Sequence, residues 1–409
     1  MSSQADTHAR PASAPRKKHR VLTALLAVVI IAGAALVGWR LTWPSFASPD
    51  QELSYRVTEL VKNNPQIRNT ALVVMKGDGS FTWSGAAGVA RQDGQVPMTA
   101  DTPIYLASVT KLYTAAAIMR LYEQGALALD DPMAKYLPED LIRGIHTYQG
   151  HDYAHEITIA QLLAHTSGMA DYYEDKGPDG KNGVDLFMDD QARAWTPEEL
   201  IARARDTMPP HFAPNAQKAY YSDTGYLLLG KIIESVTGKP LQQIYAEFFF
   251  QPLGLTHTWL STRSEPAARP AAAPAEVFSS DTDITQMRGG GSYWADGGIV
   301  ATAEDAALFL KALNEGRIIK PETLALMQQW NPIQNSGPFT YGYGTMRYTL
   351  PGPISAALGT PVIWGHTGSV GAFLYYAPDR DIYVAGTVDQ TAGQMQAIVL
   401  MMQAFQALR

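Results

Sequence analysis

The chain has 409 residues, of which 46% are hydrophobic and 17% charged, a balance typical of a globular protein with a sizeable core. It contains no cysteine, which excludes disulfides, thiolate catalysis and cysteine-ligated metal centres. The net charge is −7, and the first 20 residues hold five basic residues against one acidic residue, so the rest of the chain carries −11. We therefore expect no nucleic-acid partner.

A membrane segment is predicted near the start. Residues 21–39 form an uncharged apolar run, close to the ~20 residues that span a bilayer core. A cleaved signal peptide has a shorter apolar core of about 7–15 residues, and a candidate cleavage site at 45–47 lies well beyond the run. We favour an uncleaved signal-anchor over 21–43; cleavage, which would release the protein, is the alternative.

The charge pattern predicts how this anchor is oriented. Because five basic residues precede the apolar run and only Arg40 directly follows it, the positive-inside rule keeps the tail at 1–20 in the cytoplasm. A short linker at 44–49 then leads to a domain over 50–409, which lies on the other side of the membrane. For a bacterial protein this means the inner membrane, with the domain in the periplasm.

The domain is expected to begin with a helix and a hairpin. Residues 50–64 have the spacing of an amphipathic helix. Strand patterns follow at 69–76 and 81–90, and the Gly-Asp-Gly-Ser segment at 77–80 between them is a strong turn signal.

The later elements indicate an α+β fold. The helices expected in a mostly helical lobe over about 108–314 are 109–124, 158–164, 197–206, 224–237, 241–250 and 303–314. Strand patterns return at 340–349, 361–366, 371–377 and 381–389, before a last helix at about 391–407. The sequence thus predicts an antiparallel sheet built from both chain ends, flanked by helices, with the lobe inserted between them.

Two segments are predicted to be loops. Residues 171–190 are rich in Asp and Gly and are expected to be a solvent-exposed insertion. A calcium site there is the alternative, although the D-x-D-x-D-G order of a dedicated calcium loop is absent. Residues 264–276 form an Ala/Pro run that is expected to be a linker-like surface loop.

A serine stands three positions before a lysine at the start of an apolar helix, in Ser108-Val109-Thr110-Lys111. Positions three apart lie on one face of a helix, so both side chains can point into one cleft. A serine hydroxyl becomes a strong nucleophile when a neighbouring base takes its proton. The pair alone is a weak signal, because the spacing is common.

Two later motifs add partners for this pair. Tyr221-Ser222-Asp223 precedes an apolar helix, and His366-Thr367-Gly368 ends a predicted strand. In this order S-V-T-K, Y-S-D and H-T-G resemble the three motifs of the penicillin-recognising serine hydrolases, which include S-x-x-K, S-D-N and K-T-G variants. Tyrosine in the second motif makes the chain similar to the branch of class C β-lactamases, serine DD-carboxypeptidases and related esterases. The resemblance covers about residues 50–405.

The resemblance implies catalytic roles. Ser108 would be the acylated nucleophile, Lys111 its activator and Tyr221 the proton relay. Because coupled groups titrate as a unit, the sequence does not decide which of Lys111 and Tyr221 holds the key charge. The N–H groups of Ser108 and Ser369 would form the oxyanion hole. No metal and no cofactor is implied.

The resemblance also implies substrate-binding roles. Asp223 would stand near Lys111, and His366 would face the cleft, with Thr367 and Gly368 beside the substrate. Asp223 replaces the usual asparagine and, when ionised, only accepts hydrogen bonds. His366 replaces the lysine of β-lactamases and carries only part of a charge near neutrality. Both changes point away from efficient β-lactam hydrolysis.

The second motif has an alternative register. Ser222 would then open a Ser-x-Asn-like motif, but Thr224 would stand where the asparagine belongs. We favour the register that begins at Tyr221.

Other candidates have structural interpretations. His165 is expected to bind loop backbone at a helix end rather than take part in chemistry. For Tyr172, Tyr173 and Tyr220, a place in the cleft and a place in the packing are equally favoured.

Together these features predict a membrane-anchored serine hydrolase that acts through an acyl-enzyme on D-alanyl peptides, D-amino-acid amides or esters. Its partners would be a small-molecule or peptidoglycan-derived substrate and the membrane. Two alternatives stay open: a β-lactamase, and a penicillin or muropeptide receptor that is acylated without turnover. The acyl donor is not fixed, because loops such as 171–190 and 264–296 shape the pocket.

Overall fold

The structure is a computed structural model that describes residues 44–408 apart from 216–217, 286–292, 334–337, 351, 353–354 and 356–358. The predicted tail at 1–20 and membrane segment at 21–43 lie outside this part of the chain. Among the described residues, no helix is both long enough and apolar enough to cross a membrane. The anchor therefore stays a prediction from the sequence.

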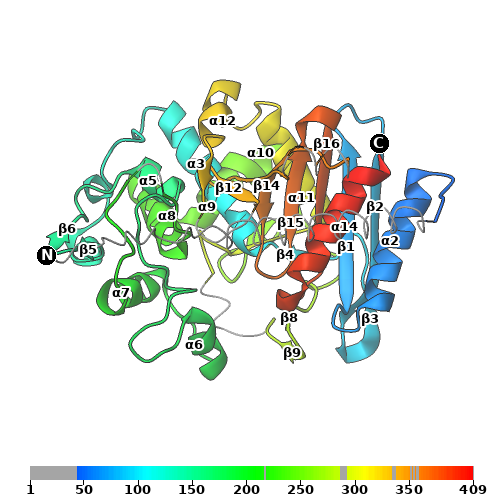
Figure 1. The fold of residues 1–409 in the computed structure, drawn as a ribbon, viewed down its shortest axis with the longest axis horizontal. Coiled ribbons are helices and arrows are strands. Elements are labelled where there is room, and N and C mark those ends of the chain that lie inside the picture. The colour runs from blue at the N-terminus through cyan, green and yellow to red at the C-terminus, as the bar shows by residue number, and fades with distance from the viewer. Residues whose placement is uncertain are drawn as a thin grey trace, which may run out of the picture.

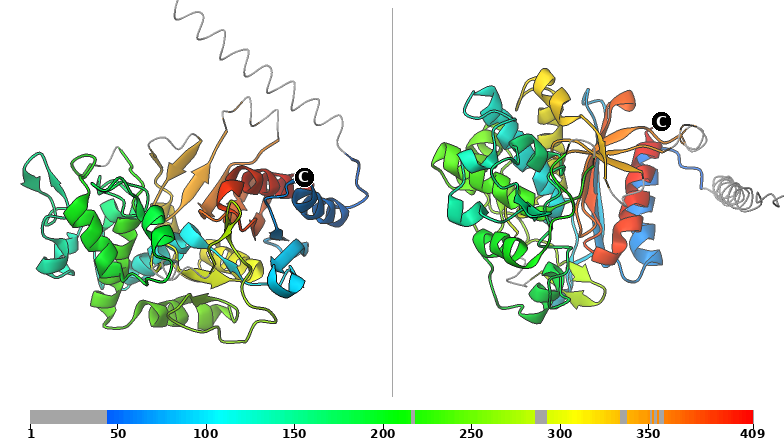
Figure 2. Two further views of the ribbon diagram at one scale, coloured as in Figure 1. Left: turned by 90° about the horizontal axis from the view of Figure 1, so that it is seen from below. Right: turned by 60° about the vertical axis from the view of Figure 1, so that its left-hand side comes forward.

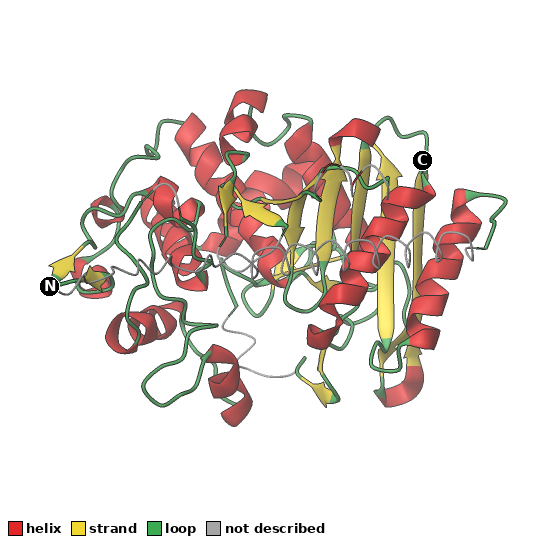
Figure 3. Cartoon of the chain, in the orientation of Figure 1, coloured by secondary structure: helices red, strands yellow, loops and turns green. Residues whose placement is uncertain are grey.

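An antiparallel sheet forms the centre of the fold (Figures 1 and 3). Its strands are β1 (Asn69–Lys76), β2 (Thr82–Arg91), β3 (Val96–Pro97), β11 (Asn331–Pro332), β12 (Phe339–Tyr341), β13 (Met346–Tyr348), β14 (Ile363–Thr367), β15 (Phe373–Ala377) and β16 (Ile382–Thr387). Over the described residues their order is β11-β12-β13-β14-β15-β16-β1-β2-β3. The pairing of β1 with β16, in which Ala71 lies opposite Thr387, joins the two ends of the chain and confirms the predicted α+β architecture.

Both faces of the sheet are covered, and the alternation of side chains along each strand decides which layer a residue meets. On β1, Leu72 and Val74 pack beneath α2 (Pro49–Asn63) and α14 (Gln394–Ala407). Val73 and Met75 belong to the opposite core, which includes α11 (Ala303–Asn314) and continues into the helical lobe. Figure 2 shows α2 and α14 side by side on one face, with the lobe on the other.

The helical lobe lies beside the sheet (Figure 1). Its helices are α3 (Thr110–Glu123), α4 (Glu139–Ile142), α5 (Ile159–Leu163), α6 (Gly183–Asp189), α7 (Pro197–Thr207), α8 (Asp223–Thr237), α9 (Leu241–Tyr245) and α10 (Gln251–Leu253). A further helix, α12 (Pro321–Met327), follows α11 in the chain. Every side chain from Thr110 to Met119 is buried, and α3 contacts α8, α9 and β14. This central helix therefore connects the lobe to the sheet.

The remaining strands are short. They are β4 (Ile104–Tyr105), β5 (Thr147–Tyr148), β6 (His151–Asp152), β7 (Trp259–Leu260), β8 (Phe278–Ser279), β9 (Thr282–Asp283) and β10 (Ile299–Ala301). Strands β4, β10 and β7 form a small sheet, and β10 pairs with β4 directly before the start of α3.

Most predicted elements are confirmed, but two differ in form. The single strand predicted at 340–349 is the hairpin β12–β13, in which Gly344 adopts φ +67°, a left-handed conformation that glycine tolerates. The helix predicted at 241–250 is α9 followed by a π-helical turn at Ala246–Phe250.

The acidic segment at 171–190 is exposed at 178–181 and 189–190, as its composition predicted, but the start of the segment is not. Asp171 and Tyr172 are fully buried, and α6 lies within the segment. Some of the buried polar groups are paired: the Tyr172 N–H donates to Thr224 Oγ1 at 3.0 Å, and the Asp223 N–H donates to Asp171 Oδ1 at 3.1 Å. Asp171 Oδ2 has no hydrogen-bond partner among the described residues.

Asp389, just after β16, is a buried carboxyl group that costs the fold stability. Its Oδ1 accepts from Thr387 Oγ1 at 2.9 Å, whereas Oδ2 has no hydrogen-bond partner among the described residues. Burial raises the pKa of Asp389 to about 8, with a smaller opposing effect of the Thr387 hydrogen bond. The unfolded chain loses this proton near pH 4, so between about pH 4 and pH 8 the folded state binds more protons and the free energy of unfolding falls as pH rises.

We expect Asp389→Asn to become more stable relative to the parent protein as pH rises from 5 to 8, by about 2 kcal/mol or more. Asparagine also tolerates the left-handed backbone at this position, where φ is +43°. Denaturant unfolding at both pH values measures the difference. Asp101→Asn, at an exposed position, is the control and should show no such trend. If the difference in unfolding free energy between Asp389→Asn and the parent protein does not change with pH, the assignment of a raised pKa to Asp389 is wrong.

Candidate active site

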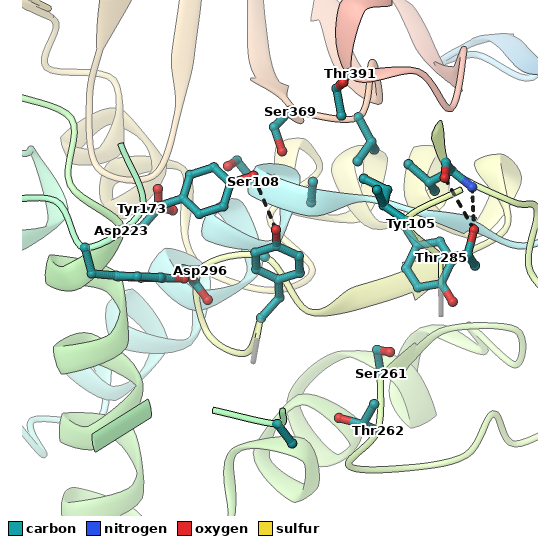
Figure 4. A pocket seen from close by; sticks show the side chains of 18 residues that line it. Tyr105, Ser108, Tyr173, Asp223, Ser261, Thr262, Thr285, Asp296, Ser369 and Thr391 are labelled. Carbon is teal, nitrogen blue, oxygen red and sulfur yellow. Dashed lines mark hydrogen bonds between the residues drawn. The ribbon is translucent and has the colours of Figure 1, made fainter. Parts of the chain in front are cut away.

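A cavity of about 480 Å³ opens beside the start of α3. Figure 4 shows Ser108, Asp223 and Asp296 toward one end, and Tyr105 and Thr285 toward the other. The walls therefore combine residues just before α3 and β10 and at the first turn of α8 with residues that follow β14.

Backbone contacts on two sides hold Ser108 in place. The preceding Ala107 has φ +46°, an uncommon conformation for alanine that is found preferentially at functional sites. The Leu106 N–H donates to the Ile299 carbonyl at 2.9 Å, so β10 supports the turn. On the other side, Gly368 lets the chain after β14 approach closely, because a Cβ there would lie 2.4 Å from the Leu106 carbonyl oxygen.

Lys111 is fully buried, and its ammonium group has three partners. Nζ donates to Ser108 Oγ at 3.1 Å, to the Asp296 main-chain carbonyl at 2.8 Å, and to the Asp223 carboxylate. The same Nζ lies 5.0 Å from the ring centre of Tyr221. The predicted catalytic residues are thus brought together around one nitrogen.

The second motif places Asp223 in the first turn of α8. Ser222 caps this helix: its Oγ accepts from the Gly225 N–H at 3.4 Å and donates to the Ala170 carbonyl at 2.9 Å. A carboxylate in the first turn is also favoured by the helix dipole. Local helix-start chemistry therefore aims the carboxylate at Lys111.

The charges of this group follow from burial and from each other. Burial lowers the pKa of the Lys111 amine, but Asp223, with contributions from Tyr221 and Asp296, outweighs burial and leaves this pKa above its usual range. Burial raises the pKa of the Tyr221 phenol, although Lys111 and Ser108 oppose the change. The resting site therefore holds an ammonium group and a neutral phenol.

A cluster of rings fixes Tyr221. Its ring centre lies 4.4 Å from that of His165 and 5.8 Å from that of Tyr341. His165 Nδ1 accepts from the Ser222 N–H at 3.1 Å, so the predicted backbone-binding role of His165 is confirmed. This histidine also supports the loop that carries the second motif.

The third motif differs from its prediction. His366 is fully buried and does not line the cavity; its Nε2 lies 3.0 Å from Tyr341 Oη and its Nδ1 lies 2.7 Å from the Thr367 carbonyl. Burial, with the Lys111 charge adding to it, lowers the pKa of His366 to about 3, so the ring is neutral. Thr367 lies outside the wall and donates to Met346 Sδ at 3.4 Å, whereas Ser369 does line the cavity.

Asp296 is a cavity residue that the sequence interpretation missed. Its Oδ1 accepts from the Trp294 N–H at 2.9 Å, and its Oδ2 accepts from Tyr172 Oη at 2.5 Å. Burial, with the Asp223 charge adding to it, raises the pKa of Asp296 to about 6. The one available signal was an aspartate directly before Gly297-Gly298 at the start of a strand.

Three tyrosines complete this end of the cavity. Tyr172, Tyr173 and Tyr293 line it, and the rings of Tyr173 and Tyr293 meet edge to face with centres 5.9 Å apart. Tyr220 is not in the wall; it donates to Asp175 at 2.5 Å and stacks on His211. Of the three tyrosines whose place was left open, two therefore belong to the cavity.

This arrangement suits nucleophilic catalysis. Ser108 faces a cavity, and its hydroxyl is hydrogen-bonded to a buried ammonium group that also contacts Asp223. Once the Lys111–Tyr221 pair has lost one proton, it can take up the serine proton and return it to a leaving group. The N–H groups of Ser108 and Ser369 as an oxyanion hole stay a prediction.

Comparison with known proteins agrees with this geometry. Residues 57–407 match the family described as Beta-lactamase. A putative D-alanyl-D-alanine carboxypeptidase of Escherichia coli K12 is 28% identical over 348 residues, which cover 75% of each chain. The esterase EstB of Burkholderia gladioli is 29% identical over 321 residues, which cover 71% of this chain and 77% of the esterase.

A solved structure gives the same result. The D-stereospecific amidohydrolase from a Streptomyces species superposes with a TM-score of 0.69 at 27% identity, covering 86% of this chain and 97% of that one. The fold and the site therefore define a serine hydrolase with the β-lactamase/transpeptidase-like architecture. The chain belongs to the Beta-lactamase family.

The charge balance predicts the effect of Asp223→Asn. Without this carboxylate, burial dominates at Lys111 and the pKa of the Lys111–Tyr221 pair falls. We expect the limb of the kcat/KM profile that reports the pair to move to lower pH by about one unit or more. Hydrolysis of p-nitrophenyl acetate from pH 6 to 10 measures it.

The matched control is Asp305→Asn, which removes another buried aspartate that has no contact with Lys111. This variant should keep the parental limb. An unmoved limb in Asp223→Asn would mean that Asp223 does not set the charge of the catalytic pair.

Proposed function

We propose that the protein hydrolyses D-alanyl peptides, D-amino-acid amides or esters through an acyl-enzyme formed at Ser108. The observation that carries the proposal is the bonding of one buried nitrogen, Lys111 Nζ, to both Ser108 Oγ and the Asp223 carboxylate. The names of the similar carboxypeptidase, esterase and amidohydrolase support the substrate classes.

The proposed reaction has two halves. In the first, Ser108 Oγ attacks the carbonyl carbon, the bond from that carbon to the leaving nitrogen or oxygen breaks, and the serine proton passes through the Lys111–Tyr221 pair to the leaving group. In the second, water attacks the ester, the acid leaves, and Ser108 regains a proton. The Asp223 carboxylate holds Lys111 in position throughout.

The third motif argues against the two rival functions. Penicillins and other β-lactams carry a carboxylate, and a cationic residue beside the strand would stabilise it. His366 supplies no such charge here, because it is buried, neutral and bonded to Tyr341. Efficient β-lactamase activity and a receptor acylated by penicillin are therefore both less favoured than hydrolysis of amides or esters.

Ser108→Ala tests the acyl-enzyme. We expect turnover of p-nitrophenyl butyrate and of D-alanine p-nitroanilide to fall by about 10³-fold or more, because the nucleophile is lost. Mass spectrometry of the parent full-length chain, quenched during turnover, should show the acyl group on the peptide that contains Ser108.

Ser261→Ala provides the control, since Ser261 is another serine of the cavity wall. This variant should retain turnover. If Ser108→Ala hydrolyses both substrates as fast as the parent, the proposal is wrong; if acylation occurs once and no second turnover follows, the receptor is the better description.

The location is part of the proposal and rests on the sequence. The uncharged run at 21–39 behind a basic tail supports an inner-membrane anchor with the catalytic domain in the periplasm, where peptidoglycan peptides are found. We expect the full chain to stay in the membrane pellet after alkaline carbonate extraction and to be digested by protease added to spheroplasts. Release of the chain into the periplasmic fraction would support the cleaved alternative instead.

A further inference from the structure

The wall of the catalytic cavity is acidic in the described part of the chain. The charged residues that line it are Asp223 and Asp296, and no Lys, Arg or His of the described residues lines it. Asp223 is neutralised by its ion pair with Lys111. Among the residues that the structure describes, Asp296 has no such partner; its two carboxyl oxygens accept from the Trp294 N–H and the Tyr172 hydroxyl.

Asp296 is equipped to hold a cation. At neutral pH its carboxyl group is mostly ionised, because its pKa is about 6. The other groups packed around it are Lys111, which binds its main-chain carbonyl, the neutral phenols of Tyr172 and Tyr293, and Asp223. Aromatic faces next to a carboxylate stabilise an ammonium group through cation–π attraction as well as charge.

Asp296 also lies within reach of the reacting carbonyl. The Lys111 ammonium binds Ser108 Oγ at 3.1 Å and the Asp296 carbonyl at 2.8 Å, so the nucleophile and Asp296 are neighbours. Figure 4 shows both side chains at the same end of the cavity. In an α-amino-acid amide or ester, the amine is attached to the atom next to the carbonyl carbon, so a short substrate can meet both groups.

We propose that the Asp296 carboxylate binds the free ammonium group of the substrate, and that the preferred substrates are amino-acid amides and esters with an unblocked amine rather than peptides that end in a carboxylate. The inference rests on the proposed acyl-enzyme at Ser108 and narrows its substrate class. A terminal carboxylate would meet an acidic wall in which no described residue supplies a counter-ion, which disfavours its binding.

Three substrates test the inference on the full-length protein at pH 7, where an α-amino group is mostly protonated. They are D-alanine p-nitroanilide, its N-acetyl derivative, and N-acetyl-D-alanyl-D-alanine. We expect kcat/KM for the free amine to exceed that for the acetylated anilide by about tenfold or more, as for a charged hydrogen bond. The dipeptide should be the poorest of the three.

Asp296→Asn should reduce the ratio between the free and the acetylated anilide to about one. The ratio is the readout because a general loss of folding or chemistry lowers both rates together. Asp305→Asn, a buried aspartate that does not line the cavity, should keep the parental ratio.

The inference is overturned if the parent protein shows a free-to-acetylated ratio of kcat/KM of one or less, or cleaves the dipeptide faster than the free amine. If turnover still depends on Ser108 in that case, the proposed function stands. An Asp296→Asn variant that keeps the parental ratio would overturn the role of Asp296. Absence of Ser108-dependent turnover on all three anilide and peptide substrates and on p-nitrophenyl esters would instead refute the proposed function itself.

Discussion

The ammonium group of Lys111 and the carboxylate of Asp223 meet where almost no water reaches, since Lys111 is fully buried and Asp223 is 6% exposed. Removing one partner of such a pair leaves an uncompensated charge and costs about 3–5 kcal/mol. The surrounding structure is arranged to keep both in place: Ser222 caps the helix that carries Asp223, and Asp171 accepts from the Asp223 N–H. Because Lys111 also holds Ser108, the stability of this pair and the placement of the nucleophile depend on the same contacts.

The sheet and the lobe meet at this pair through backbone contacts. A Cβ at Gly344 would lie 2.7 Å from the Lys111 carbonyl oxygen, and a Cβ at Gly368 would lie 2.4 Å from that of Leu106. Strand-side segments are thus pressed against both sides of the helix start that carries Ser108. Main-chain contacts vary less than contacts between long side chains, which suits a site whose geometry must be held closely.

How far the sequence could predict this site depends on the range of the interactions involved. Ser108, Lys111 and Asp223 were found because motif spacing and helix starts are local features. The buried position of His366 could not be predicted in this way, because it depends on Tyr341, which comes from a neighbouring part of the sheet and binds the imidazole. The helices and strands could be predicted because periodicity is also a local feature of the sequence. The burial of residues 171 and 172 could not, because it depends on polar partners on α8 that composition does not reveal.

The electrostatic character of the cavity follows from two changes that act in the same direction. Because His366 is neutral and buried, no described residue places a cation on the strand side of the site, and Asp296 adds a carboxylate that no described basic side chain pairs with. A substrate group that enters a partly closed cavity loses water and needs a partner of opposite charge. The catalytic centre and the substrate wall are therefore separable. Lys111 and Asp223 cancel each other's charge and serve the chemistry, while Asp296 gives the described part of the wall one net negative charge for the substrate to balance.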